Sequence, residues 1–374
     1  MRPARAAVQR NRRAVESRTT IEKLVPVFRL PILSLLTLLL AAPALRQATP
    51  EPDPMRAFLR NQMGFGASDL AALDAGRAVA RQMKTRDPVD VNIFGAVRVD
   101  AAPEAFAQQL QNIDALERKL GINQVGKFHE PPQLADLDGL TLERDDFADL
   151  QSCRVADCAL QLPAAAIERF RKEVNWRAPD ARQTADRVFR AILFARLETY
   201  RTGGLAAIEP YQDRAVPISV AEDFRLLSSP GDMPADLPEL AYFLRTYPKA
   251  NLPGATNVFY WNKGEFGMKP TTRLNHLVIY PAPQPSSGRL RYVAATSQIY
   301  GNHYFSATLE LRSVVDDPVQ PGKRFYLFYT TKSRVSGLTS FVGVLIRPMV
   351  RSRARSGMER YLGITKKVVE DAAR

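Results

Sequence analysis

The chain has 374 residues, 45% of them hydrophobic and 24% charged, and a formal net charge of +13. This composition excludes a collagen, a coiled coil, a wholly disordered chain and a membrane protein of many spans. The positive charge is concentrated at the two ends: residues 1–44 hold eight basic and two acidic side chains, and residues 347–374 hold eight and three. Residues 45–346 carry only +2, so the charge is a property of the ends rather than of the body of the protein.

The amino-terminal 44 residues have the three-part pattern of a secretory signal peptide. A basic region precedes the uncharged, leucine-rich run 30–45, and Ala42-Pro43-Ala44 places small residues where a cleavage site needs them. The run is short for a membrane span, which needs about 20 residues. We therefore expect cleavage near Ala44 and an exported protein, periplasmic or secreted. The alternatives are a protein anchored by an uncleaved signal and a cytosolic protein with a misleading apolar stretch.

Apolar periodicity predicts the elements of the amino-terminal half. After a polar spacer, residues 55–83 favour an amphipathic helix broken near Gly64–Gly66, so that 45–88 is a spacer with helices. Residues 89–99 alternate as a half-buried strand, and a helix begins at Pro103. A mixed stretch up to 155, a helix over 163–200 and a proline-rich stretch up to 255 with a short helix around 237–247 follow.

The pattern changes at Thr256 to short runs rich in Val, Ile, Tyr, Phe and Thr. Strands are predicted at 256–261, 271–280, 289–300, 303–315 and 324–331. Their short connections favour an antiparallel sheet. A long helix that starts near Pro348 and reaches residue 372 has an apolar stripe to pack on this sheet and basic flanks that stay in water.

Two stretches resemble the START-like helix-grip superfamily, also called SRPBCC. They are DVNIFGAVRVDAAPEAFAQQLQNIDAL (90–116) and the strands plus terminal helix of 256–372. The resemblance implies an α+β fold in which a curved antiparallel sheet wraps the long C-terminal helix. The domain would span 89–374, with a helical insertion over about 117–255. It further implies an internal cavity of several hundred Å³ that holds a lipid or another apolar molecule, with catalysis in a minority of members.

Polar and aromatic residues between 259 and 329 supply the candidate ligand-binding side chains: Tyr260, Trp261, His276, Gln298, Tyr300, His303 and Tyr329. His276 and His303 are each in phase with apolar neighbours, and Gln298 and Tyr300 share a phase with Tyr292, which directs them to the core or to a cavity. Each histidine has three interpretations: a hydrogen-bonded core residue, a ligand contact, or an acid–base catalyst. No catalytic residue is assigned.

Cys153 and Cys158, in the sequence CRVADC, suggest a small local disulfide if the protein is exported. Free thiols and redox or metal chemistry are the alternatives. The sequence has no P-loop, Rossmann, G-x-S-x-G or H-E-x-x-H motif, and its three histidines are far apart, so we expect no cofactor and no metal.

Three functions are therefore open. We favour an exported START-like protein that binds an apolar ligand such as a lipid, at the cell envelope. The second is a hydrolase- or cyclase-type enzyme that uses a pocket histidine or tyrosine. The third, which is compatible with the first, is contact with a membrane surface through the basic C-terminal helix. Export argues against nucleic acid as a partner.

Overall fold

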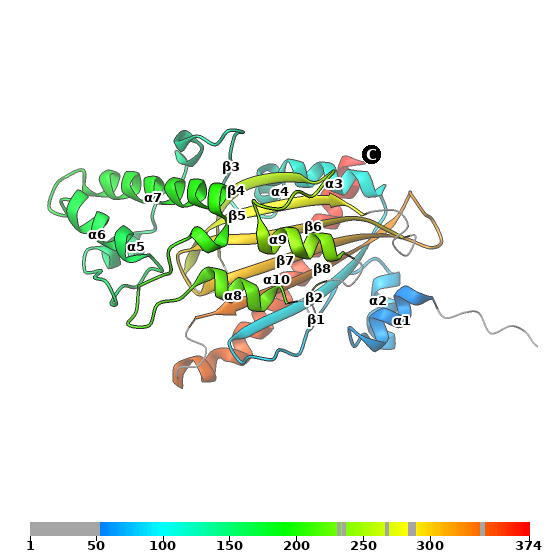
Figure 1. Ribbon diagram of the computed structural model, residues 1–374. Helices are drawn as coiled ribbons and strands as arrows, with labels where there is room; N and C mark the ends of the chain where they lie inside the picture. The colour runs from blue at the N-terminus through cyan, green and yellow to red at the C-terminus, as the bar shows by residue number, and fades with distance from the viewer. Residues whose placement is uncertain (1–52, 230–232, 234–236, 266–268, 283–288, 337–340) are drawn as a thin grey trace, which may run out of the picture. The chain divides into compact units, whose positions relative to one another are not determined.

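The computed structural model describes residues 53–374 except 230–232, 234–236, 266–268, 283–288 and 337–340, and all of them belong to one compact unit, Pro52–Arg374 (Figure 1). The predicted signal peptide and its cleavage near Ala44 lie outside the described residues. None of the described helices is both long and apolar enough to cross a membrane.

The centre of this unit is an open antiparallel sheet, with eight strands among the described residues in the order β1-β2-β8-β7-β6-β5-β4-β3. The six strands expected from the sequence are all present: β2 (Asp90–Val99), β4 (Thr256–Glu265), β5 (Pro270–Pro281), β6 (Leu290–Gly301), β7 (Phe305–Asp316) and β8 (Phe325–Val335). A short strand at each edge was not predicted: β1 (Val79–Gln82) and β3 (Gln124–Lys127). The helical prediction for 79–82 is wrong, because these residues pair with Ile93–Ala96 of β2 and bury Val79 and Ala80.

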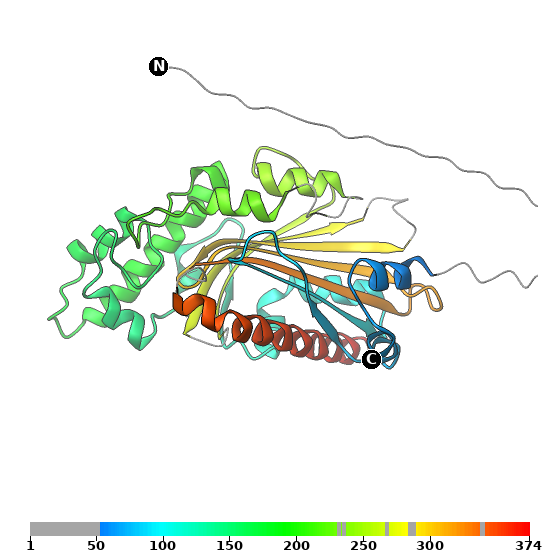
Figure 2. The same cartoon turned by 90° about the horizontal axis from the view of Figure 1, so that it is seen from below.

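Helices cover both faces of the sheet. We call inner the face to which Val97, Leu277 and Leu327 belong, and outer the opposite face, to which Phe94 and Leu309 belong. The helices packed on the inner face are α3 (Pro103–Gln111), α4 (Ile113–Lys119) and α10 (Phe341–Ala372). Figure 2 shows α10 on one side of the sheet and the middle of the chain on the other.

The outer face is packed against α1 (Pro54–Asn61), α2 (Ala67–Asp74), α7 (Ala181–Gly203), α8 (Val220–Leu227) and α9 (Pro238–Thr246). The prediction that 89–99 is half-buried is therefore wrong: Phe94 and Ala96 of β2 pack against α1 and α2, while Val97 packs on the inner side. The remaining helical segments are α5 (Arg144–Leu150), α6 (Ala164–Glu173) and the 3-10 turns η1 (Leu134–Leu137) and η2 (Leu205–Ala207). The single helix expected over 163–200 is two, α6 and α7.

Helix α10 lies close against β2, and a glycine makes this approach possible. A Cβ atom on Gly95 would lie 2.7 Å from side-chain atoms of both Met358 and Leu362. The predicted apolar stripe is confirmed by the burial of Met358, Leu362 and Val369. The helix begins at Phe341, so Pro348 lies inside it and does not mark its start as expected.

The α+β prediction is confirmed, and an antiparallel sheet with a C-terminal helix on one face is compatible with a helix-grip arrangement. Cys153 and Cys158, in the turn that follows α5, are joined by a disulfide.

Candidate functional site

The seven candidate ligand-binding residues do not come together. Tyr260, Gln298 and Tyr329 lie on the inner face of the sheet. Trp261, His276 and Tyr300 lie on the outer face, and His303 is in the turn between β6 and β7. They cannot line one pocket, because the sheet itself separates the first three from the next three.

A β-bulge divides Gln298 from Tyr300. Leu274 of β5 pairs with Tyr300 and the next residue, Asn275, pairs with Gln298, so Ile299 is an extra residue in β6. The bulge reverses the alternation, and Tyr300 then points to the outer face beside Leu274. The prediction that Gln298 and Tyr300 share a phase is therefore wrong.

His276 is a fully buried histidine in the outer core, in phase with Leu274, Val278 and Tyr280 as predicted. Its Nε2–H donates to Oδ1 of Asn257 at 2.8 Å, and its Nδ1 accepts from the Tyr200 hydroxyl at 2.8 Å. Burial lowers the pKa of His276 from 6.5 to about 3, so the ring is neutral at physiological pH. With both nitrogens occupied, the residue has the geometry of a hydrogen-bonded core histidine.

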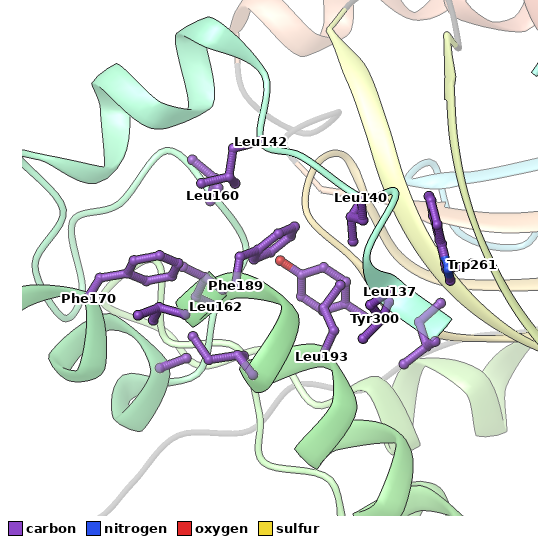
Figure 3. Close-up of a cluster of buried hydrophobic side chains, with 14 of the residues drawn as sticks. Leu137, Leu140, Leu142, Leu160, Leu162, Phe170, Phe189, Leu193, Trp261 and Tyr300 are labelled. Atoms are coloured by element: carbon purple, nitrogen blue, oxygen red, sulfur yellow. The ribbon is translucent and has the colours of Figure 1, made fainter. Parts of the chain in front are cut away.

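Trp261 and Tyr300 pack beneath α7 in a cluster of buried apolar side chains (Figure 3). The indole Nε1–H of Trp261 donates to the carbonyl oxygen of Asp136 at 2.8 Å. The ring of Tyr300 meets that of Phe189 edge-on at a centroid distance of 6.1 Å, and the Arg196 guanidinium lies 5.7 Å from its centroid. Both residues therefore serve the packing of the outer layer.

His303 is held by a carboxylate of α5. Its Nε2–H donates to Oδ1 of Asp146 at 2.8 Å, and Nδ2 of Asn302 donates to Oδ2 of the same residue at 2.9 Å. The predicted phase of His303 with strand residues is wrong, because β7 begins only at Phe305. An Asp–His pair is the arrangement in which a carboxylate orients a general base, so His303 is the histidine on which the enzymatic alternative would depend.

The inner face carries a buried charged cluster, which we call the polar centre: Arg273 and Asn275 on β5, Glu310 and Arg312 on β7, and Tyr329 on β8. Each arginine donates from Nη2 to one carboxylate oxygen of Glu310, Arg273 at 2.8 Å and Arg312 at 2.7 Å. The Tyr329 hydroxyl also donates to Glu310, at 2.8 Å. Burial raises the pKa of Glu310, but the two arginines outweigh it and lower the value to about 2, so this carboxylate is ionised.

Three elements around the polar centre contribute further polar groups. Arg312 donates from Nη1 to the Thr296 hydroxyl at 3.0 Å and from Nε to the Tyr361 hydroxyl of α10 at 3.1 Å. On α4, Glu117 accepts from Nδ2 of Asn262 at 3.1 Å. Burial raises the pKa of Glu117, which favours its neutral form. The polar centre itself holds two guanidiniums, those of Arg273 and Arg312, and one carboxylate, that of Glu310.

Asn275 differs from its neighbours because both ends of its side-chain amide are unpaired among the described residues. Its side chain is fully buried, and neither Nδ2 nor Oδ1 has a hydrogen-bond partner among the described residues. Oε1 of Gln298, on the neighbouring strand, is likewise buried without a partner. Buried polar atoms are almost always paired, so these two amides can still bind a polar group.

A hollow of about 250 Å³ opens beside the inner face, along one side of α3. It is lined by Glu104, Ala107, Gln108 and Gln111 of α3, by Ile279 and Pro281 of β5, and by Gly254, Thr256 and Tyr292. The expected cavity was to be lined by the sheet and the terminal helix, whereas α3 provides the helical wall of this hollow.

A second hollow, of about 360 Å³, lies at the amino end of α8, where Ser219, Glu222, Arg334 and Ser336 are among its lining residues. The guanidinium of Arg334 already contacts three carboxylates, those of Asp87, Asp90 and Asp223, at 2.9–3.0 Å. Its positive charge is therefore compensated within the protein and is not available to a negatively charged ligand.

Sequence reasoning missed Arg273, Asn275, Glu310 and Arg312. A signal for them was present: Glu310 and Arg312 are in phase inside a run of strand-forming residues, as are Arg273 and Asn275 in another. Charges of opposite sign at alternate positions of two nearby strands indicate a polar patch on one face of a sheet.

No family model, curated protein or solved structure matches the chain. Within the part of the chain that the structure describes, no group of three His, Cys, Asp or Glu side chains is arranged to hold a metal ion.

Proposed function

We propose that the chain is a START-like (SRPBCC) helix-grip binding protein that holds a lipid-like molecule between the inner face of the sheet and the helices that cover it. The observation that carries the proposal is the fully buried amide of Asn275 in the polar centre, which has no hydrogen-bond partner among the described residues. Leaving a buried polar group unpaired costs about 1–3 kcal/mol. A bound polar group would supply the missing hydrogen bonds and offset this cost.

The polar centre suits a headgroup that accepts hydrogen bonds, and an acidic one in particular. Arg273 and Arg312 share the ionised carboxylate of Glu310, and burial raises the pKa of Glu117, which favours the neutral form of that second carboxyl group. The guanidiniums are buried, and in such a site a negative group is attracted more strongly than in water.

The apolar part of the ligand would follow the inner face from the polar centre to the hollow beside α3. Leu277, Ile279 and Ala294 lie along this path and are buried apolar residues of the inner face. Asn275 and Ile279 are four residues apart on one strand, a distance of about 14 Å at the usual rise of about 3.4 Å per residue. The hollow at Ile279 would be the opening of this path to solvent.

Mass spectrometry tests the proposal on the full chain, both as native protein and after solvent extraction. A lipid-like molecule should co-purify, and a fluorescent fatty acid should bind and be displaced by it. Gln108→Trp, which places a large side chain in the hollow, should weaken binding of the probe. Ala115→Trp on an exposed position of α4, outside the hollow, should leave it unchanged. A chain that carries no such molecule and does not bind the probe is not a lipid-binding protein.

Location at the cell envelope rests on the signal-peptide pattern alone. Amino-terminal sequencing of the protein recovered from the periplasmic fraction or the medium tests it, with a new terminus just after Ala44 as the expected result. An intact Met1 on a protein confined to the cytosol would rule it out.

A further inference from the structure

Residues 345–360 of α10 carry a basic surface. They include five arginines and one glutamate. Arg353, Arg355 and Arg360 are exposed. The carboxyl-terminal half packs through Met358, Leu362 and Val369, so the sheet does not cover the opposite side of the helix.

Two exposed apolar side chains lie on the same surface. Leu345 is 66% exposed and Met349 is 41% exposed. They are four residues apart, and Ser352 and Ser356 continue their row at helical spacing. Arg353 and Arg360 stand on one side of this row and Arg355 on the other. An apolar row with basic flanks is the pattern of a helix that lies in the headgroup region of an anionic membrane.

We propose that residues 345–360 of α10 dock on a membrane surface rich in anionic phospholipids. Charge complementarity carries this proposal: arginine guanidiniums pair with lipid phosphates, while Leu345 and Met349 reach the acyl boundary. Each basic residue near such a surface contributes roughly 1 kcal/mol, or about a fivefold change in partition, which makes three of them worth on the order of 100-fold. Docking does not use the polar centre and is therefore independent of the proposed lipid binding.

Co-sedimentation of the full chain with vesicles tests the docking surface. The vesicles are either pure phosphatidylcholine or an equimolar mixture with phosphatidylglycerol. The variant R353Q/R355Q/R360Q should bind the anionic vesicles about 100-fold more weakly than the unchanged chain. The matched control R171Q/R177Q/R187Q removes the same charge from exposed positions of the helical region near α6 and α7 and should bind normally. All three proteins contain the apolar run 30–45, so any contribution of this run to vesicle binding is common to them.

Two further observations make the test decisive. Binding of the unchanged chain should weaken when the ionic strength rises, because salt screens exposed charges. Asn275→Leu should dock like the unchanged chain, which separates this surface from the ligand site. Equal binding by the two triple variants would overturn the proposal. A second result would also overturn it: no variant binds anionic vesicles, and R353Q/R355Q/R360Q loses binding to a short DNA duplex.

Discussion

The unpartnered amide of Asn275 leads to a prediction in which stability and binding change in opposite directions. Asn275→Leu keeps a side chain of similar size and removes the two buried polar atoms that have no partner. The folded chain no longer bears a desolvation cost of about 1–3 kcal/mol, so its free energy of unfolding should rise by that amount. At about 2.1 cal/mol/K of unfolding entropy per residue, the melting temperature of a unit of this length should rise by about 2–4 °C.

The same substitution should abolish or strongly weaken ligand binding, because the headgroup loses the amide that satisfies it. Urea denaturation and titration with the fluorescent fatty acid measure the two effects on the same preparation. Asn262→Leu is the matched control on the inner face. It removes the donor to Glu117 and should lower the free energy of unfolding by about 1–3 kcal/mol.

Two results would refute the reasoning. If Asn275→Leu is less stable than the unchanged chain by more than about 1 kcal/mol when both are free of bound ligand, the amide has partners in the folded protein, and its role is structural. If the variant is more stable and binds the probe as before, the polar centre does not contact the ligand.

Three further predictions concern the core. Below pH 6.5 His276 is protonated in the unfolded chain but not in the folded chain, where its pKa is about 3. The free energy of unfolding should therefore fall by about 2 kcal/mol from pH 7 to pH 5, and His276→Gln should not show this loss. Urea denaturation at both pH values measures the difference. Gly95→Ala should cost about 1–3 kcal/mol, because its Cβ meets Met358 and Leu362, and an unchanged urea midpoint would contradict the close packing of α10. Replacement of Cys153 and Cys158 by serine should cost about 2 kcal/mol for the small loop that they close, which thermal melts under non-reducing conditions would show.

The sequence predicted the strands after residue 256 and the packing stripe of α10, since both depend on local properties of the chain. β-Branched and aromatic residues mark strands, and apolar residues three and four apart mark one side of a helix. The short edge strands were missed for the opposite reason. Val79–Gln82 becomes a strand only because β2 is there to pair with it.

The candidate site was predicted less well, because it depends on which face of the sheet each residue occupies. One extra residue at Ile299 moves Tyr300 to the other face from Gln298, and strict alternation cannot reveal such a bulge. The large aromatic residues were predicted to bind a ligand, and most of them pack in the core. Glu310 and Arg312 are among the polar side chains that distinguish the inner face. They entered the sequence analysis only through the net charge, and their shared face of the sheet was not predicted.

The polar centre is difficult to explain as a device for stability. Two buried arginines and a buried glutamate lose their hydration on folding, and apolar residues of similar volume often replace such a cluster with no loss of stability. A chain selected only for a stable core has no need of this cluster, and still less of the unpaired amide beside it. The proposed ligand, by supplying the missing hydrogen bonds, would account for both. Tyr361 would have a role as well, because its hydrogen bond with Arg312 links α10 to the polar centre.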